Sequence, residues 1–138
     1  MLRAAVLGDP LSHSLSPKLH HYWLKELAIA GSYEAIHTSK DALADTLKRL
    51  QEEGFGGCNL TLPLKEAAFD CVDTISEEAE AIGAINTVLF KQGKTLGSNT
   101  DAYGFMENVK MSVAISHLIC NIVLLLAQAA RRRRCITV

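Results

Sequence analysis

Short apolar segments alternate with segments of helical periodicity along most of the chain, and this alternation constrains the fold more than any other feature. Residues 2–8, 33–37 and 56–62 are strand candidates, the first of which ends at a Gly-Asp-Pro turn. Residues 16–31 and 41–53 lie between them as helix candidates. The pattern predicts a three-layer α/β/α domain with an open, mostly parallel sheet and helices on both faces.

Local signals indicate where several of these elements begin and end. Ser16, followed by proline, is typical of a helix N-cap. The second helix candidate stops at a glycine and carries three leucines on one face, Leu43, Leu47 and Leu50. Residues 65–72 and 76–82 predict two shorter helical segments. Residues 86–95 predict a hairpin that turns at Gln92-Gly93 and supplies the one antiparallel strand of the sheet.

Charge and cysteine usage exclude several classes of partner. The 14 basic and 15 acidic side chains give a formal net charge of -1, so no overall field attracts nucleic acid or an anionic membrane. The four cysteines are too far apart for a metal or redox motif, and the five histidines do not complete one. The first residues lack a secretory signal, which predicts a cytoplasmic location, and no metal is expected.

Polar side chains follow the first and third predicted strands, where ligands bind in open parallel sheets. They are Ser14, Ser16, Asn59, Thr61 and Lys65. Ser16 alone is explained equally well as a helix cap, but Ser14 is not needed for one. Two hydroxyls beside a helix N-terminus can instead hold a carboxylate or a phosphate, because the backbone N–H groups there point outward.

Lys65 on its own is most simply a solvated surface lysine. Residues 83–88 (GAINTV) and 97–105 (GSNTDAYGF) place further amides and hydroxyls at the ends of the predicted hairpin, together with Asp101. Residues 99–101 also fit a plain turn and helix cap. A carboxylate close to a lysine holds the ammonium in place and shifts both pKa values, which is the usual arrangement of a proton-transfer pair.

Four stretches together resemble the shikimate dehydrogenases, over about residues 4–110. They are DPLSHSLSP, GGCNLTLPLKEAAF, AIGAINTV and GSNTDAYGF, which match the family's substrate-domain motifs in order and spacing. The resemblance implies that Ser14 and Ser16 bind the substrate carboxylate. It implies that four residues line the hydroxylated ring, namely Asn59, Thr61, Asn86 and Thr100.

The resemblance also implies a reaction and its catalytic residues. Members of the family interconvert shikimate and 3-dehydroshikimate while hydride passes to or from NADP. Lys65 and Asp101 occupy the catalytic positions and also contact the substrate. The lysine would donate a proton to the ketone oxygen as negative charge develops there, and the aspartate would hold the lysine in position.

The resemblance ends near Lys110. The family continues into a Rossmann domain with a glycine-rich phosphate loop, whereas residues 111–138 contain no glycine. Residues 126–131 read LAQAAR, which is what the codons of a LGAGGA loop encode when they are read one base forward. We therefore interpret residues 111–138 as a tail outside the family, translated in a shifted frame from DNA for the NADP-binding domain. The isolated chain is then expected to bind substrate without turning it over.

The tail also admits other interpretations. Residues 113–130 are mostly apolar and precede four arginines, as in a membrane anchor. Polar residues within the stretch and its minimal length argue against an anchor, and four charges without aromatic neighbours are a weak signal for nucleic acid. The expected partner is a small molecule, and the oligomeric state is left open. The alternative function is a non-catalytic module that binds a hydroxylated ring carboxylate such as shikimate or quinate.

Overall fold

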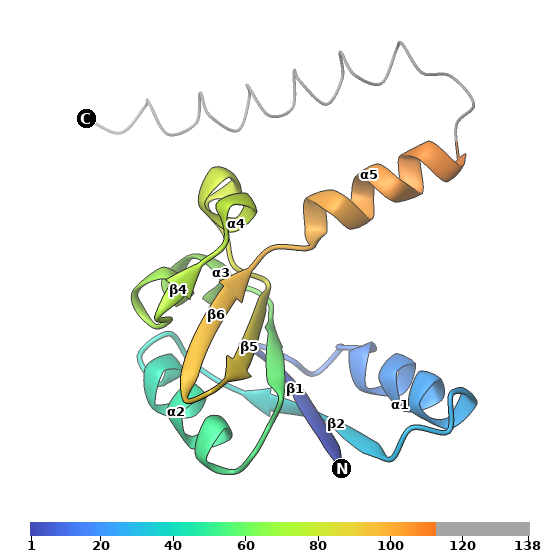
Figure 1. Ribbon diagram of the computed structural model, residues 1–138, viewed down its shortest axis with the longest axis horizontal. Helices are drawn as coiled ribbons and strands as arrows, with labels where there is room; N and C mark the ends of the chain where they lie inside the picture. The colour runs from blue at the N-terminus through green and yellow to red at the C-terminus, as the bar shows by residue number, and fades with distance from the viewer. Residues whose placement is uncertain (113–138) are drawn as a thin grey trace. The chain divides into compact units, whose positions relative to one another are not determined.

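The computed structural model describes residues 1–112, and the chain divides into two compact units after Thr100. Within the first unit six strands form one sheet in the order β2-β1-β3-β5-β6-β4 (Figure 1). The strands are β1 (Leu2–Gly8), β2 (Gly31–His37), β3 (Gly57–Leu60), β4 (Thr74–Ile75), β5 (Thr87–Lys91) and β6 (Lys94–Ser98). Only β5 runs antiparallel to its neighbours, so the predicted mixed α/β sheet is confirmed.

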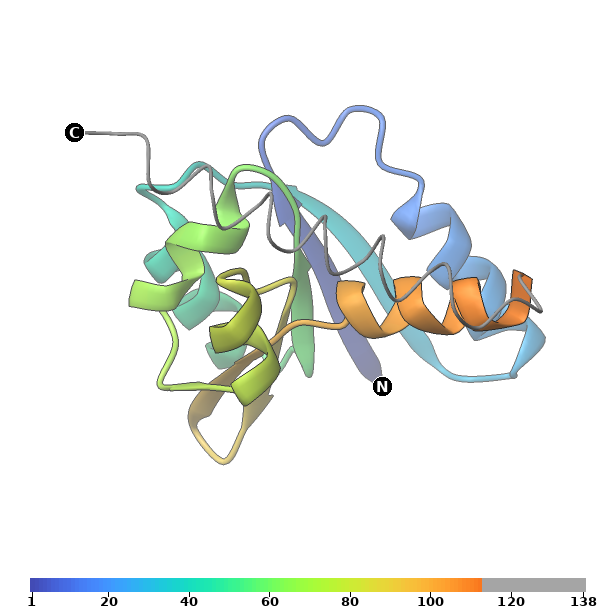
Figure 2. The same ribbon diagram turned by 90° about the horizontal axis from the view of Figure 1, so that it is seen from above.

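Helices cover both faces of this sheet, as predicted (Figure 2). One face carries α2 (Leu43–Glu52), α3 (Leu64–Ala67) with the 3₁₀ turn η1 (Ala68–Asp70), and α4 (Glu77–Ile82); the other carries α1 (Ser16–Glu26). The first turn of α4 is capped by Ser76, whose hydroxyl accepts the Ala79 N–H at 3.3 Å. The second unit begins with α5 (Asp101–Ser112). The rest of the predicted tail lies outside the described residues.

The predicted extent of the first helix is wrong, because α1 ends at Glu26 and not near residue 31. Ala28 adopts a left-handed conformation with φ of +52°. The Ala28 N–H donates to the Lys25 carbonyl and the Ile29 N–H to the Leu24 carbonyl, the bonding pattern of a Schellman motif. The chain then enters β2 at Gly31, two residues before the predicted start of that strand. A left-handed alanine gives no sequence signal of the kind that glycine gives.

The hydrophobic core lies between β1 and the helices α2, α3 and α4. Leu43, Leu47 and Leu50 are buried as predicted, and they pack in one cluster with Ala5 and Leu7 of β1. Burial of each leucine contributes roughly 1.5–3 kcal/mol relative to exposure. In contrast, α1 contributes no fully buried side chain. The core therefore lies on the face of the sheet covered by α2, α3 and α4, and the face covered by α1 is less tightly packed.

The hairpin of β5 and β6 turns at Gln92 and Gly93, whose φ values are +53° and +76°. The hairpin turn predicted at these residues is confirmed. Two left-handed residues in succession are typical of a type I′ turn, whose twist matches that of the paired strands. Strand β4 was not predicted. It has two residues and pairs in parallel with β6. A carboxylate fixes this edge: Asp73 Oδ2 accepts the Thr95 N–H at 2.7 Å and the Thr95 hydroxyl at 2.8 Å.

Asp73→Asn is expected to destabilise the protein at neutral pH but not in acid. The hydrogen bonds from Thr95 lower the pKa of the Asp73 carboxyl below its ordinary value. The folded state therefore gains stability while the carboxylate is ionised, and loses it as the pH falls through the lowered pKa. Urea unfolding of both proteins at about pH 7 and at about pH 2 measures the difference. The exposed Asp41→Asn is the matched control, and an equal Asp73→Asn effect at both pH values would contradict the prediction.

Within residues 1–112 we find no helix with the length and apolar character that crossing a bilayer requires. The apolar stretch at 113–130 and the four arginines lie outside the described residues.

Candidate functional site

Thr61 is held against the carboxyl end of β1. Its N–H donates to the Leu7 carbonyl at 2.9 Å, and the Asp9 N–H donates to the Leu62 carbonyl at 3.2 Å. A Cβ at Gly8 would lie 2.4 Å from Thr61 Cγ2, so only glycine permits this approach. The third strand was predicted to continue to residue 62, but β3 ends at Leu60. Thr61 therefore lies at the sheet edge where a ligand site was expected.

Lys65 lies in the first turn of α3, directly beyond that edge. The Leu64 N–H donates to the Thr61 carbonyl at 2.9 Å, and the Leu64 side chain is fully buried. The Lys65 carbonyl accepts the Ile85 N–H at 2.8 Å. The lysine backbone is thus anchored both to Thr61 and to the segment that carries Asn86. The helix is shorter than predicted, since α3 ends at Ala67 and continues as the 3₁₀ turn.

Asn86 and Thr100, which the motifs placed at the ends of the predicted hairpin, are brought together. Asn86 is 7% exposed, and its Oδ1 accepts the Thr100 N–H at 3.1 Å. Its Nδ2 lies 3.1 Å from the Thr100 hydroxyl oxygen. The Asn86 backbone also bridges two strands, because its N–H donates to Ser98 and its carbonyl accepts from Leu60. The backbone of Asn86 therefore connects the end of β6 to the end of β3, and its buried side chain bonds Thr100.

Asn59 lies in β3 and contacts the same group of amides and hydroxyls. Its Nδ2 donates to the Thr87 hydroxyl at 3.2 Å, and its Oδ1 accepts the Tyr33 hydroxyl hydrogen at 2.7 Å. Tyr33 was predicted only as part of a strand, although it is a member of this network. The strand register explains the contact: Tyr33 pairs with Ala4 and Asn59 with Val6, which places both side chains on one face.

Burial raises the pKa of the Tyr33 hydroxyl to about 12. The residue is 4% exposed, so the charged phenolate is disfavoured and the phenol keeps its proton at physiological pH. The neighbouring Cys58 thiol is also buried, and its pKa is likewise raised to about 12. Both groups are neutral under physiological conditions. Tyr33 is therefore a hydrogen-bond donor to Asn59.

Ser14 lies between β1 and α1 and Ser16 begins α1, so the predicted cap at Ser16 is wrong. Ser16 is the first helical residue, Leu15 occupies the N-cap position, and no side chain caps the helix there. Ser14 makes the local contact instead, because its Oγ accepts the Ser16 N–H at 3.4 Å. Both serines are half-buried. The expectation that they bind an anion stays a prediction.

Asp101 is the first residue of α5 and belongs to the second compact unit. The predicted Lys65–Asp101 pair therefore stays a prediction. Among residues 1–112 there is no cluster of three histidine, cysteine or acidic side chains that could hold a metal ion.

The group formed by Thr61, Lys65, Asn86 and Thr100 offers an ammonium, an amide and hydroxyls. Such a set can bind a small molecule that carries hydroxyl or carbonyl oxygens.

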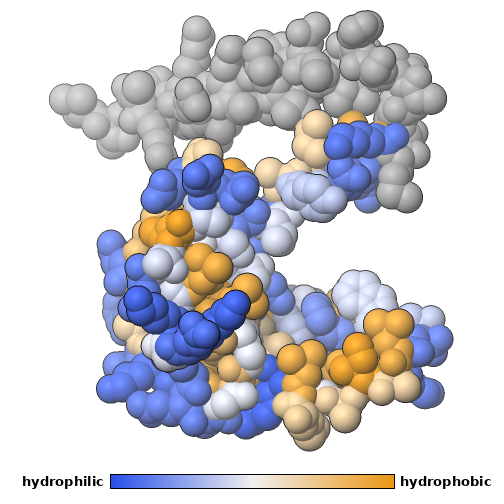
Figure 3. Space-filling model, viewed as in Figure 1, coloured by the Kyte–Doolittle hydropathy of each residue, from blue (hydrophilic) through white to orange (hydrophobic). Residues whose placement is uncertain are grey.

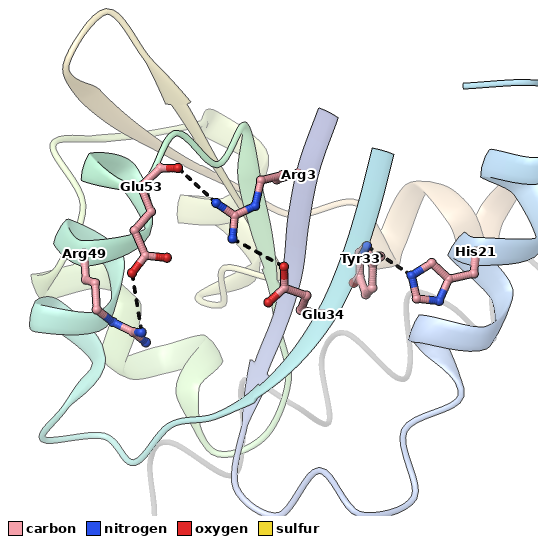
Figure 4. A network of polar contacts seen from close by, with 6 residues as sticks. All are labelled: Arg3, His21, Tyr33, Glu34, Arg49 and Glu53. Carbon is pink, nitrogen blue, oxygen red and sulfur yellow. Dashed lines mark hydrogen bonds and ion pairs between the residues drawn. The ribbon is translucent and has the colours of Figure 1, made fainter. Parts of the chain in front are cut away.

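A second set of polar contacts lies at the amino-terminal end of β1 (Figure 4). Arg3 donates to the Glu53 carbonyl at 3.1 Å, pairs with Glu34 at 3.5 Å and lies 4.0 Å from the centre of the Phe55 ring. The Arg3 guanidinium therefore contacts Glu34 of β2, Phe55 and the backbone of Glu53, which directly follows α2. Because all these partners lie within the protein, we interpret the contacts as structural. A pocket beside it is lined mainly by apolar and backbone atoms of β1, β3 and β5. Figure 3 shows that apolar surface also gathers near the amino terminus.

Comparison with known proteins identifies the relatives of this chain. A family profile described as the shikimate dehydrogenase substrate binding domain matches residues 6–88. The NADP(+)-dependent shikimate dehydrogenase of Thermus thermophilus is 54% identical over 110 residues. That alignment covers 80% of this chain and 41% of the relative, so the chain spans well under half the length of the enzyme it matches.

Solved structures give the same match. The Thermus thermophilus shikimate 5-dehydrogenase, in complex with NADP(H) and shikimate, superposes with a TM-score of 0.77 and 53% identity, covering 80% of this chain and 42% of that one. The ligand-free 5-ketofructose reductase of a Gluconobacter strain superposes with a TM-score of 0.78 and 27% identity, covering 82% and 41%. The fold is therefore shared by proteins named for different substrates.

Proposed function

The chain belongs to the shikimate dehydrogenase substrate binding domain family, and we propose that it binds shikimate or 3-dehydroshikimate at the carboxyl edge of the sheet. The observation that carries this proposal is the convergence of Thr61, Lys65, Asn86 and Thr100 through backbone and side-chain hydrogen bonds. These groups match a ring that carries several hydroxyls. The partly exposed Lys65 adds the one positive charge of this group.

We assign roles to the site residues in the order the motifs suggest. Ser14 and Ser16 hold the carboxylate, and Thr61, Asn86 and Thr100 contact the ring hydroxyls. The resemblance also places Asn59 at the ring, but because its amide bonds Tyr33 and Thr87 we give it a supporting role. Lys65 donates a proton to the ketone oxygen during reduction and accepts it during oxidation. Asp101 is its proposed partner on the strength of the motif alone. The location of the protein in the cytoplasm likewise stays a prediction.

The described residues do not fit NADP. Phosphates of a dinucleotide bind a glycine-rich turn that joins a strand to a helix. The closely spaced glycines here, at 54, 56 and 57, lie instead before and at the start of β3. We therefore place the NADP site outside residues 1–112. Hydride transfer belongs to a complete enzyme, and we expect this chain by itself to bind substrate without forming NADPH.

Calorimetric titration tests the proposal. Shikimate should bind the chain at least about tenfold more tightly than 1-cyclohexene-1-carboxylate, which keeps the carboxylate and ring but lacks the hydroxyls that Thr61, Asn86 and Thr100 would bind. Equal affinities, or no heat from either ligand, would remove the proposed site. Sustained formation of NADPH from shikimate by the purified chain would contradict our placement of the cofactor.

A second candidate is a non-catalytic module that binds shikimate, quinate or a related ring acid. The match to a 5-ketofructose reductase favours keeping it, because the same fold serves a protein named for another substrate. Joining residues 1–110 to the cofactor-binding part of the Thermus enzyme distinguishes the two, since only the catalytic function predicts turnover.

We also retain the proposal that residues 111–138 come from a shifted reading frame. Sequencing the DNA tests it, and the idea fails if no other frame encodes a glycine-rich loop.

A further inference from the structure

Tyr33 fixes the orientation of the Asn59 amide. A neutral phenol at 2.7 Å from Oδ1 donates to the oxygen of the amide, so the NH₂ group must face the other way. There Nδ2 meets the Thr87 hydroxyl at 3.2 Å and the Asn86 carbonyl at 3.5 Å. Rotation of the amide by half a turn would break the bond that the phenol donates and would place an oxygen against the Asn86 carbonyl, which can only accept. The Tyr33 hydroxyl and this carbonyl therefore favour one of the two amide orientations.

The orientation of Asn59 passes to Asn86 through Thr87. Because the Thr87 oxygen accepts from Asn59, its hydrogen is available for Asn86 Oδ1, which lies 2.8 Å away. Asn86 Oδ1 also accepts the Thr100 N–H at 3.1 Å and lies 3.3 Å from the Thr100 hydroxyl oxygen, while Nδ2 lies 3.1 Å from the same hydroxyl. Each member of the series Tyr33, Asn59, Thr87 and Asn86 thus donates in the same direction. Asn86 and Thr100, at the end of the series, are proposed substrate contacts.

The ring of Tyr33 is held from the other side by α1. His20 stacks on it with ring centres 3.8 Å apart and an angle of 9° between the planes. His20 Nδ1 lies 2.9 Å from the Ser16 carbonyl, which can only accept, so this nitrogen carries the hydrogen. Trp23 packs edge-on against His20 at 5.3 Å. The tyrosine therefore lies between the helix that begins at Ser16 and the strands that carry Asn59 and Thr87.

We propose that Tyr33 is a positioning residue for the substrate site, which orients the Asn86 amide toward the ligand through Asn59 and Thr87. The inference rests on the proposed function, because Asn86 is assigned there as a ring contact. Tyr33 itself is buried, so we assign it a positioning role and no direct contact with the ligand. Its role is to present one amide orientation before the ligand arrives, so that binding does not have to reorder the amides.

Tyr33→Phe tests the inference in the full chain. The variant removes only the hydroxyl, and we expect about a tenfold loss of shikimate affinity, the size of one lost buried hydrogen bond. The exposed Tyr22→Phe in α1 makes the same chemical change and should bind like the unmodified chain. Side-chain amide resonances of Asn59 and Asn86 should shift in Tyr33→Phe without ligand, while backbone resonances of α2 stay unchanged.

Thr87 provides an independent test of the route. Thr87→Val interrupts the series and should lower affinity and shift the Asn86 amide resonances, whereas Thr87→Ser restores most of the affinity. Combining Tyr33→Phe with Thr87→Val should cost no more than Thr87→Val alone, because the second change already breaks the path. Additive losses would overturn the route through Thr87. If Tyr33→Phe fails to fold, Thr87→Val and Thr87→Ser still test the link from Thr87 to Asn86, and unchanged Asn86 amide resonances in Thr87→Val would overturn it.

The outcomes separate this inference from the proposed function. If the unmodified chain binds shikimate and Tyr33→Phe binds it equally well, the positioning role is wrong and the function stands. If the unmodified chain does not bind shikimate, the proposed function fails. The ligand-free amide resonances then still decide whether Tyr33 orients Asn86, and unchanged resonances would overturn the inference by themselves.

Discussion

Lys65→Ala should lower kcat at least about a hundredfold in an enzyme made by joining residues 1–110 to the cofactor-binding part of the Thermus relative, with a much smaller change in KM. General acid–base groups contribute roughly a hundredfold to ten-thousandfold. Alanine leaves no donor for the ketone oxygen, whereas Thr61, Asn86 and Thr100 still hold the ring. Initial rates of NADPH formation at varied shikimate concentrations measure both constants.

The control for this experiment is Lys48→Ala. Lys48 is an exposed lysine of α2, the helix whose leucines pack in the hydrophobic core. It should leave both constants unchanged, which separates loss of the catalytic group from loss of positive charge. A near-normal kcat for Lys65→Ala would remove the lysine from the reaction. A rise in KM alone would make it a binding group only.

Gly57→Ala should lower the free energy of unfolding by about 3 kcal/mol. Overpacking typically costs roughly 1–3 kcal/mol, and we expect the upper end because the clashing atoms belong to the backbone, which cannot move aside as a side chain can. A Cβ at Gly57 would lie 2.4 Å from the Val88 carbonyl oxygen and 3.3 Å from Leu89 Cα. Because Gly57 pairs with Leu89, relief requires β5 to move away from β3. Urea unfolding measures the change as a lower midpoint.

The neighbouring glycine is the matched control. A Cβ at Gly56 would lie 3.5 Å from Leu2 Cδ1, an ordinary contact, so Gly56→Ala should change stability by less than about 1 kcal/mol. Movement of β5 would also disturb Asn59 and Thr87, which pair with each other two register positions along. Gly57→Ala should therefore weaken shikimate binding in whatever fraction stays folded. Equal midpoints for the two variants would contradict the packing argument.

The fold was largely predictable because its signals are local. Alternation of strand and helix patterns predicted the mixed sheet, and leucine spacing predicted the buried face of α2. Residues Gln92 and Gly93 predicted the hairpin that makes β5 antiparallel. Strand β4 was missed because two residues are too few to show any alternation. The end of α1 was misplaced because Ala28 adopts a conformation for which sequence patterns expect glycine.

The site was predictable only in part, because its members come from separate strands. The motifs placed Asn86 and Thr100 at the ends of the predicted hairpin, and the structure joins the two residues by hydrogen bonds. Their contact with a substrate stays a prediction. Tyr33 could not be predicted, since its contact with Asn59 depends on the register of three strands. Ser16 was expected to cap α1, but it is the first helical residue and its N–H donates to Ser14 Oγ. The difference depends on the residue at which α1 starts, and helix boundaries differ by one or two residues between criteria.

A map of ¹H–¹⁵N chemical-shift changes during titration of the chain with shikimate probes the proposed substrate site residue by residue. We expect the largest changes to cluster at Thr61, Lys65, Asn86 and Thr100, with smaller changes at Tyr33 and none in α2. Changes confined to other surfaces, or no changes at saturating shikimate, would show that the carboxyl edge of the sheet does not bind this ligand.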